Sequence, residues 1–422
     1  MDYLTQNKTR KFLSVLFGLF IISTFFPYIR IFPFSTDLQP NTLLIGLFII
    51  FLLIRKTTPI AIPKKLLLLS IPVICGVFIF LLFDVTSNGI RSLGGYISVF
   101  IISISTFLIF RNGYKFKIKT LYYIILIWGI VGAIQFFFYK GFLSFLMSRF
   151  AFLESEGYGE RGVSALSNEP SFYGSICFFL WITFITNKEY ITVNRKTRFL
   201  VLVSLVAQMS LFASSSVSIL YFLILGVAYV IMNSNKIVLI ILVIALLSTS
   251  TFIGNYVLDF TEYLVGKNRV FNIIQIFIES KEELIYIDPS INERFFNVYI
   301  SVRGSFENFL LPNGFDTFAE YKKSLMNSEL SDLYWWTTDK HTRIQSGYGA
   351  ILYELGAIGL IIPIIFNYFL YSYLKYDKKR FWIVAIAVNL TMFSTIPISL
   401  PLFSFLIGYF AYQSSEKIFL IK

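Results

Sequence analysis

The sequence predicts an all-α polytopic membrane protein with about twelve transmembrane helices and a long periplasmic loop containing amphipathic helices. Hydrophobic residues make up 56% of the 422 residues and charged residues only 14%, which is too little polar surface to cover a soluble globule of this size. The mean hydropathy of +0.72 also indicates a membrane protein. The polar residues are also unevenly placed, because residues 255–346 hold 13 of the 24 acidic residues and the one histidine.

Twelve apolar segments predict the spans. They lie at residues 12–28, 41–54, 66–83, 93–110, 121–139, 171–187, 199–213, 217–232, 237–253, 347–371, 381–396 and 402–411. A helix crosses the ~30 Å hydrocarbon core with ~20 residues, which is the scale of these segments. We therefore expect a membrane domain at 1–254 with nine spans and an outward loop at 140–170. A long periplasmic loop at 255–346 and three last spans at 347–422 follow.

The placement of basic residues predicts the orientation. Of the 36 Lys and Arg, 22 fall in segments that this topology makes cytoplasmic, 5 in short outward segments and 9 in the long loop. This is the positive-inside bias, so the net charge of +12 indicates a membrane orientation and no nucleic-acid partner. Both termini are then cytoplasmic, and the first apolar segment is a retained helix and not a cleaved signal peptide.

The composition gives little indication of a metal site or of disulfide bonds. The two cysteines, Cys75 and Cys177, each lie inside an apolar segment, so the sequence indicates neither a disulfide framework nor a thiolate metal site. A single histidine and the absence of an Asp-x-Asp pair leave no obvious cation site either. We expect no cofactor.

The long loop contains a predicted amphipathic helix at residues 292–310, where apolar residues recur every three or four positions. Arg294 and Arg303 lie in it, nine residues or about 180° apart, so we expect them not to share a face unless Gly304 or a turn breaks the helix. The following Pro312-Asn313-Gly314 is a strong turn signal. His341 and Arg343 come shortly before the tenth span.

The smaller outward loop ends at a predicted helix start. It carries Arg161-Gly162 and then Asn168-Glu169-Pro170-Ser171, in which Asn168 or Glu169 can cap the helix and Pro170 fits its first turn. A helix N-terminus with a nearby arginine can bind an anion such as phosphate, although a well-capped helix is the simpler interpretation. Glu354 is the one acidic side chain that we place within a span, which makes it a functional candidate.

These residues resemble a family, the integral-membrane O-antigen polymerases and the related O-antigen ligases of bacterial envelope polysaccharide assembly. Three segments carry the resemblance: Arg161-Gly162 with Glu169-Pro170-Ser171, Arg294 and Arg303 with Pro312-Asn313-Gly314-Phe315, and His341 with the Leu-x-Glu-x-Gly-x-x-Gly-Leu pattern of residues 352–360. The chain departs from the family at Ser214-Ser215-Ser216-Val217, where a serine-arginine pair is usual, and at Asp316, where a second glycine is usual.

The resemblance implies a glycosyltransferase of the GT-C type, of the polymerase (Wzy) kind. Such an enzyme transfers a glycan from undecaprenyl diphosphate to a sugar hydroxyl at the periplasmic face of the bacterial inner membrane, without a metal. Arg161, Arg294, Arg303 and Arg343 would then bind the substrate diphosphate, because arginine is always charged and binds phosphate in a bidentate manner. His341 would be the catalytic base, with Glu169 or Glu354 orienting it or acting instead.

The implied partners are the undecaprenyl-diphosphate-linked oligosaccharide and membrane lipids, with a chain-length regulator and a flippase of the same pathway as candidate partner proteins. Two alternatives stay open. An O-antigen ligase would transfer the glycan to lipid A-core and shares most of the motifs. A lipid-linked oligosaccharide flippase or other transporter would also have twelve spans, but it does not ordinarily need so long an outward loop, and we find no related halves.

Overall fold

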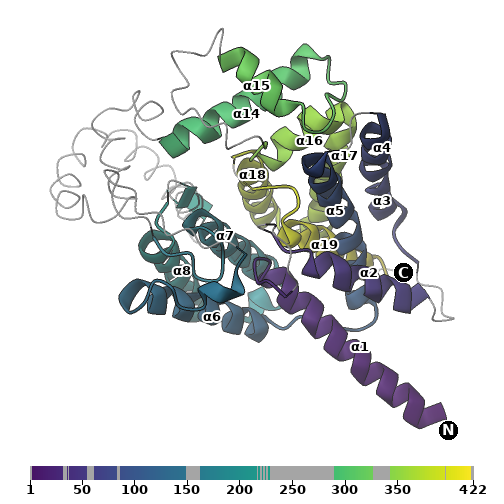
Figure 1. Cartoon of the computed structure of the whole chain (residues 1–422). Helices are drawn as coiled ribbons and strands as arrows, with labels where there is room; N and C mark the ends of the chain where they lie inside the picture. Colours follow the sequence, from purple (N-terminus) through teal and green to yellow (C-terminus); the bar gives the residue numbers. More distant parts are fainter. Residues whose placement is uncertain are drawn as a thin grey trace.

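The computed structural model of the chain describes residues 2–31, 36, 38–54, 61–82, 86–148, 162–215, 217–218, 221, 224, 227–228, 289–326, 343–394 and 396–419. These residues are helical or in turns, with one isolated antiparallel bridge between Ile29 and Met147. The all-α prediction is therefore confirmed over the described part of the chain. Figure 1 shows the helices as one body, from which the N-terminal part of α1 projects.

The first half of the chain supplies eight labelled α-helices. They are α1 (Asp2–Phe25), α2 (Asn41–Ile54), α3 (Lys64–Leu67), α4 (Ser70–Leu82), α5 (Ser87–Arg111), α6 (Ile118–Phe137), α7 (Pro170–Thr186) and α8 (Arg195–Ala207). Shorter turns are η1 (Ser144–Leu146), η2 (Lys188–Thr192) and η3 (Gln208–Phe212), the last a π-helical turn that continues α8.

The second half begins, in the described residues, with two helices of the predicted long loop, α14 (Pro289–Glu307) and α15 (Phe318–Met326). They are followed by α16 (Gly347–Leu355), η4 (Gly356–Leu360), α17 (Ile361–Leu374), α18 (Lys378–Ser394) and α19 (Pro401–Phe419). The predicted amphipathic helix at 292–310 is thus found as α14, whose last predicted residues instead form a turn.

Four described segments are long and apolar enough to cross a membrane: Lys64–Leu82, Ser87–Arg111, Ile118–Phe137 and Gly347–Leu374. Three shorter apolar helices lie at Phe12–Phe25, Asn41–Ile54 and Pro170–Thr186. These seven segments coincide with seven predicted spans. Helices α8, α18 and α19 overlap three more, but α8 and α18 begin with basic residues and α19 ends in a polar turn. The predicted span at 217–232 lies largely, and that at 237–253 wholly, outside the described residues.

Helix α7 lies at the centre of the bundle. All of its residues except Phe172 are buried, as expected of a helix that is apolar on every side. Its Tyr173 hydroxyl donates to the carbonyl of Trp128 on α6 at 3.0 Å and to Gln208 Oε1 at 2.9 Å, at the start of the π-helical turn. This contact ties α6, α7 and α8 into one layer.

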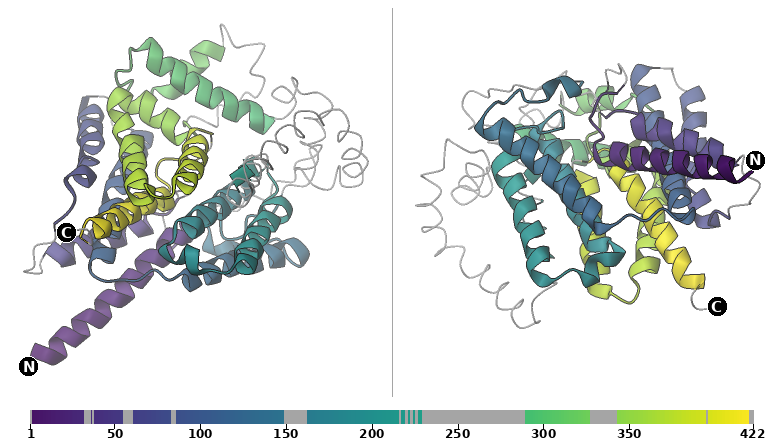
Figure 2. Two further views of the ribbon diagram at one scale, coloured as in Figure 1. Left: turned by 180° about the vertical axis from the view of Figure 1, so that it is seen from behind. Right: turned by 90° about the horizontal axis from the view of Figure 1, so that it is seen from below.

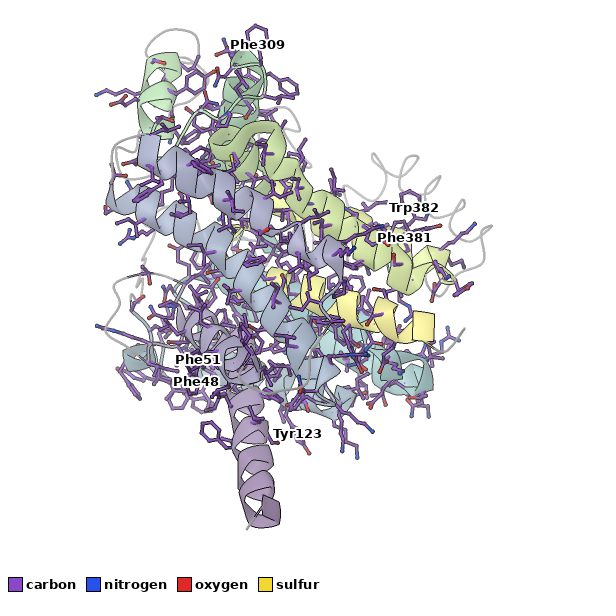
Figure 3. All side chains as sticks on the ribbon, turned by 90° about the vertical axis from the view of Figure 1, so that its right-hand side faces the viewer. Phe48, Phe51, Tyr123, Phe309, Phe381 and Trp382 are labelled. Atoms are coloured by element: carbon purple, nitrogen blue, oxygen red, sulfur yellow. The ribbon has the colours of Figure 1, made fainter. Side chains whose placement is uncertain are left out.

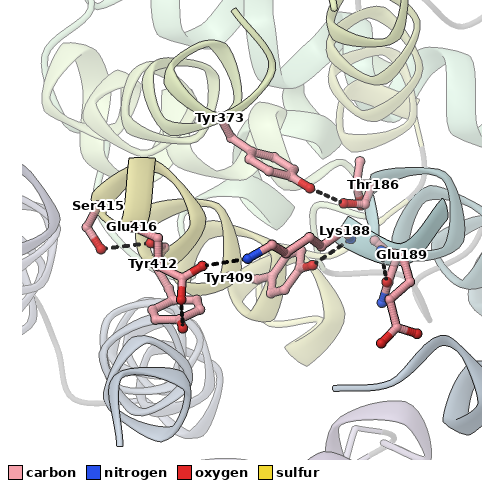
Figure 4. A network of polar contacts seen from close by, with 9 residues as sticks. Thr186, Lys188, Glu189, Tyr373, Tyr409, Tyr412, Ser415 and Glu416 are labelled. Atoms are coloured by element: carbon pink, nitrogen blue, oxygen red, sulfur yellow. Dashed lines mark hydrogen bonds and ion pairs between the residues drawn. The ribbon is translucent and has the colours of Figure 1, made fainter. Parts of the chain in front are cut away.

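At one end of the bundle, polar side chains join α7, α17 and α19 (Figure 4). Lys188 forms an ion pair with Glu416 at 3.1 Å, and the Tyr373 hydroxyl donates to the carbonyl of Thr186 at 2.8 Å. Arg380, a buried cation of the same end, pairs with Asp377 at 2.7 Å and donates to the Ile185 carbonyl. These basic residues hold helix ends together, and this is the end that the sequence predicts to face the cytoplasm.

The opposite end carries α14 and α15, which lie across α16 in Figure 1 and in the view from behind in Figure 2. A small second core fixes them there, made of Phe296, Ile300, Phe318, Leu325 and Tyr353. Because Tyr353 belongs to α16, this second core packs the two helices of the polar loop on the apolar bundle.

Candidate functional site

A groove runs along α14 where this helix faces α18 and the short segment that follows η3. Its volume is about 570 Å³, which is within the range of small-molecule sites. We call it the α14 groove; its lining residues in the described part of the chain are Val217, Ile291, Arg294, Phe295, Val298, Tyr299, Val302, Arg303, Phe393 and Ser394. Most of these side chains are apolar, and the two charged ones are arginines.

Arg294 and Arg303 both line this groove, although they are expected on opposite sides of the helix. Helix α14 continues through Gly304 without a break. The two arginines therefore stay about 180° apart around the axis, and the apolar stripe that contains Val298 runs between them. The groove is wide enough for long side chains to reach it from both edges of the stripe. Along the axis, nine residues separate them by about 13.5 Å.

Arg303 is held in place by its own helix. Its Nε donates to Glu307 Oε1 at 2.7 Å, and the Tyr321 hydroxyl of α15 donates to the other carboxylate oxygen at 2.5 Å. These hydrogen bonds, first that of Tyr321 and then that of Arg303, lower the pKa of Glu307 below its usual value. The Glu307 carboxyl group that pairs with Arg303 is therefore stabilised in its ionised form.

The smaller outward loop contacts the segment that forms one wall of the groove. Gly162 N–H donates to the Ser214 carbonyl at 3.2 Å, and Val163 N–H donates to the Phe212 carbonyl at 2.6 Å. A Cβ on Gly162 would come within 2.1 Å of the Phe212 oxygen, so only glycine allows this approach. Gly162 of this motif thus lies beside the segment that follows η3, and Val217 of that segment lines the groove.

Glu169 is the N-cap residue of α7, and Pro170 occupies the first turn as predicted. The Glu169 side chain makes no capping hydrogen bond; it accepts a long contact of 3.5 Å from Ser171 Oγ. Gly174, one turn further along α7, lies against Ser218 of the segment that follows η3. The start of α7 and the groove wall are therefore neighbours, which brings Glu169 to the same side of the bundle as the groove.

Glu354 lies elsewhere, in a buried polar cluster between α16 and α5. Ser92 Oγ donates to Glu354 Oε1 at 2.9 Å, and the Tyr96 hydroxyl donates to Oε2 at 2.5 Å. Glu354 is only 9% exposed. We call Ser92, Tyr96 and Glu354 the α5–α16 cluster. Both carboxylate oxygens are engaged by donors of the neighbouring helix, which fastens α16 to α5.

The predicted turn at residues 312–314 docks on the end of α16 beside this cluster. Asn313 N–H donates to the Tyr353 carbonyl at 3.0 Å, and Ala357 N–H donates to the Leu310 carbonyl at 2.8 Å. Phe315 stacks on Tyr96, with ring centroids 6.1 Å apart. Two of the sequence segments that resemble the polymerase family, about forty residues apart in the chain, therefore meet in space.

Arg343 is also outside the α14 groove. Its guanidinium donates to Asn88 Oδ1 at 3.1 Å, and Asn88 Nδ2 donates to Asp316 Oδ1 at 2.8 Å. The backbone carbonyl of Arg343 accepts from Asn297 Nδ2 at 3.3 Å. Arg343 therefore contacts α14 at Asn297 and is not among the residues that line the groove.

Two predicted site residues, Arg161 and His341, lie outside the described residues. The expected proximity of Arg161 and Arg294 around one diphosphate stays a prediction for the same reason. Among the residues that the structure describes, no three His, Cys, Asp or Glu side chains gather as a metal site would require.

The sequence did not single out the partners of these residues. Ser92 and Tyr96 are four positions apart and thus on one face of α5, a polar pair on an apolar helix that could have indicated a buried partner. The groove residues Phe393, Ser394 and Val217 gave no such signal, because they are ordinary apolar or small residues at the ends of predicted spans.

Comparisons of the chain with protein-family models, curated proteins and solved structures found no match.

Proposed function

We propose that this chain is an integral-membrane glycosyltransferase that polymerises undecaprenyl-diphosphate-linked repeat units of a surface polysaccharide, the O-antigen, at the periplasmic face of the bacterial inner membrane. The proposal needs no metal ion. One observation carries it: the α14 groove combines an apolar lining with an arginine at each edge. A polyprenyl diphosphate has the matching chemistry, because its hydrocarbon chain suits the lining and its diphosphate suits arginine.

The separation of the two arginines favours a polymerase. The Cα atoms of Arg294 and Arg303 lie about 13.5 Å apart along α14 and on opposite sides of its axis, so each side chain can bind a diphosphate of its own. A polymerase holds two lipid-linked reactants, the growing chain and the incoming repeat unit, and each brings its own diphosphate. One arginine for each diphosphate is the arrangement that this spacing supports.

The reaction would proceed by direct displacement. The acceptor sugar hydroxyl attacks the anomeric carbon of the donor glycan, a new glycosidic bond forms, and the bond from that carbon to the diphosphate oxygen breaks. The diphosphate leaves with the bonding electrons, and an arginine neutralises the added charge. The hydroxyl proton passes to a general base, for which His341 is our candidate because its ordinary pKa lies near neutrality.

The geometry separates the roles of the two candidate glutamates. Glu169 lies at the start of α7, near the segment after η3 that forms a wall of the groove. It is therefore suited to orient a base or an acceptor hydroxyl there. Glu354 is buried and accepts from Ser92 and Tyr96. We therefore assign Glu354 a positioning role, in which it holds α16 and the turn at 312–314 against α5.

The alternative of an O-antigen ligase uses the same donor but a different acceptor, so the groove alone supports it nearly as well. A flippase would also use an apolar groove with cations. Neither alternative explains why the two arginines stand at separate ends of the groove as directly as two lipid diphosphates do.

A deletion strain complemented with variant chains tests the proposal. Loss of a polymerase leaves lipopolysaccharide capped with single repeat units. Loss of a ligase leaves no attached O-chain and lets lipid-linked polymer accumulate, and loss of a flippase leaves single lipid-linked units on the cytoplasmic side. We expect the first phenotype, and restoration of long chains by the wild-type protein. Either of the other two phenotypes would contradict the proposal.

A further inference from the structure

The turn that follows α14 presents three large apolar side chains to the outside. Phe306 is 64% exposed, Phe309 is 88% exposed and Leu311 is 60% exposed. Figure 3 shows Phe309 at the outermost end of the molecule, pointing away from the bundle. A water-facing turn would ordinarily carry polar residues, so three exposed apolar side chains within six residues indicate a contact surface.

The shape of this turn is fixed and not a result of loose packing. Phe309 and Leu310 have φ values of 54° and 58°, a region that residues with a Cβ rarely adopt. Hydrogen bonds hold them there: Leu310 N–H donates to the Ser305 carbonyl at 2.7 Å, and its own carbonyl accepts from Ala357 N–H at 2.8 Å. The backbone thus keeps an unfavourable conformation that turns Phe309 outward.

The turn lies where the apolar segment Gly347–Leu374, which is longer than one membrane crossing requires, is interrupted at Gly356. Helix α17 has 14 residues and η4 has 5, and at about 1.5 Å per residue for the first and about 2.0 Å for the second they span about 31 Å together. This equals the hydrocarbon thickness of ~30 Å. If Lys375 marks one membrane boundary, Gly356 marks the other, and Leu310 is hydrogen-bonded to the next residue, Ala357.

We propose that Phe306, Phe309 and Leu311 form an interfacial anchor that inserts into the outer surface of the lipid bilayer and fixes the end of α14 relative to the membrane. Aromatic side chains favour this interface. The one charged residue of the turn, Glu307, is paired with Arg303, so the anchor depends on apolar contact and not on anionic lipids. The anchor rests on the membrane placement in the proposed function, but not on glycan transfer.

Wild-type protein in lipid nanodiscs provides a first test. A phosphatidylcholine with a photoreactive group near its glycerol backbone is irradiated, and the chain is digested with trypsin. Cleavage after Arg303 and Lys322 releases residues 304–322, and cleavage after Lys65 and Arg91 releases residues 66–91 with the exposed end of α4. We expect lipid adducts on both peptides, with the first adduct located at residues 306–311. Adducts on 66–91 alone would overturn the anchor, and adducts on neither would also contradict the membrane placement.

A second test measures depth at one position. Phe309→Cys and, as a matched control on α15, the exposed Lys323→Cys are labelled with an environment-sensitive fluorophore, with the wild-type chain as the blank. We expect lipids with a quencher near the headgroup to quench the Phe309 site several-fold more than the Lys323 site, and aqueous iodide to show the reverse order. Equal iodide quenching at both sites would overturn the anchor. So would protection from both quenchers that grows with protein concentration, which would indicate a second copy of the chain as the partner.

Discussion

The α14 groove and the α5–α16 cluster both contain residues that the sequence marks as functional, yet their charged groups have different surroundings. In the groove, Arg294 and Arg303 lie at the edges of an apolar lining, with Arg303 also paired with the exposed Glu307. In the cluster, both oxygens of Glu354 accept hydrogen bonds from hydroxyls of α5. A cation beside an apolar groove suits an amphiphilic anion, whereas a carboxylate whose two oxygens are engaged by the fold stabilises that fold.

The comparison implies that substitutions in the groove should impair glycan transfer more than folding, and that substitutions around the cluster should impair folding first. Substitutions at five positions test this division, in order of decreasing expected effect.

Arg294→Ala and Arg303→Ala should each lower glycan transfer by about 100-fold, because each removes a fixed cation from a developing or bound diphosphate. Protein abundance and thermal stability should stay near those of the wild type. Polymer formed per enzyme in membrane vesicles is the measurement, and Lys323→Ala on the exposed face of α15 is the matched control. Normal transfer by either arginine variant at wild-type abundance would remove that residue from the site.

Gly356→Ala should lower the free energy of unfolding by at least ~2 kcal/mol, because the added Cβ combines a clash with a disfavoured backbone angle. The Cβ would come within 2.2 Å of the Leu310 carbonyl oxygen, at a φ of 62°. Gly94→Ala is the control, since a Cβ there meets nothing within 4 Å. Thermal unfolding in detergent compares them, and equal Tm values would show that the junction of α16 with the turn is not fixed as described.

Glu354→Gln distinguishes a positioning residue from a base. Glutamine keeps the shape and can still form hydrogen bonds with Ser92 and Tyr96, so transfer should fall less than tenfold. Glu354→Ala should lower the free energy of unfolding by about 1–3 kcal/mol, because the buried hydroxyls of Ser92 and Tyr96 lose their acceptor. Loss of transfer in Glu354→Gln with an unchanged Tm would instead make Glu354 the base.

Tyr321→Phe should produce the smallest effect, present above about pH 4.5 and absent in strong acid. The pKa of Glu307 is lowered from its usual 4.5, first by the hydrogen bond from Tyr321. Its contribution to stability is therefore complete above about pH 4.5 and is lost as the pH falls through the lower folded-state pKa. Without Tyr321 the folded-state pKa moves back toward 4.5, so the loss should be smaller and should end at a higher pH. Because Glu307 is exposed, the Tm should change by a few degrees at most. Identical Tm–pH profiles would contradict this assignment.

The sequence predicted those features that depend on local pattern. Hydropathy located the apolar helices, the 3.6-residue period located α14, and Pro312-Asn313-Gly314 located a turn. It could not predict that Glu354 meets Ser92 and Tyr96, because that contact joins residues about 260 positions apart. It also could not predict that Arg294 and Arg303 line one groove from opposite sides of α14, because that depends on how α14 lies over α18 and Val217.

Direct binding of undecaprenyl diphosphate to the purified protein tests the central claim, that the arginines of the α14 groove bind polyprenyl diphosphates, one at each edge. Wild type, the double variant Arg294→Gln with Arg303→Gln, and Lys323→Gln as control would be compared in the same detergent. The account predicts a Kd at least ~10-fold higher for the double variant and an unchanged Kd for Lys323→Gln. A double variant that binds as tightly as the wild type would contradict it.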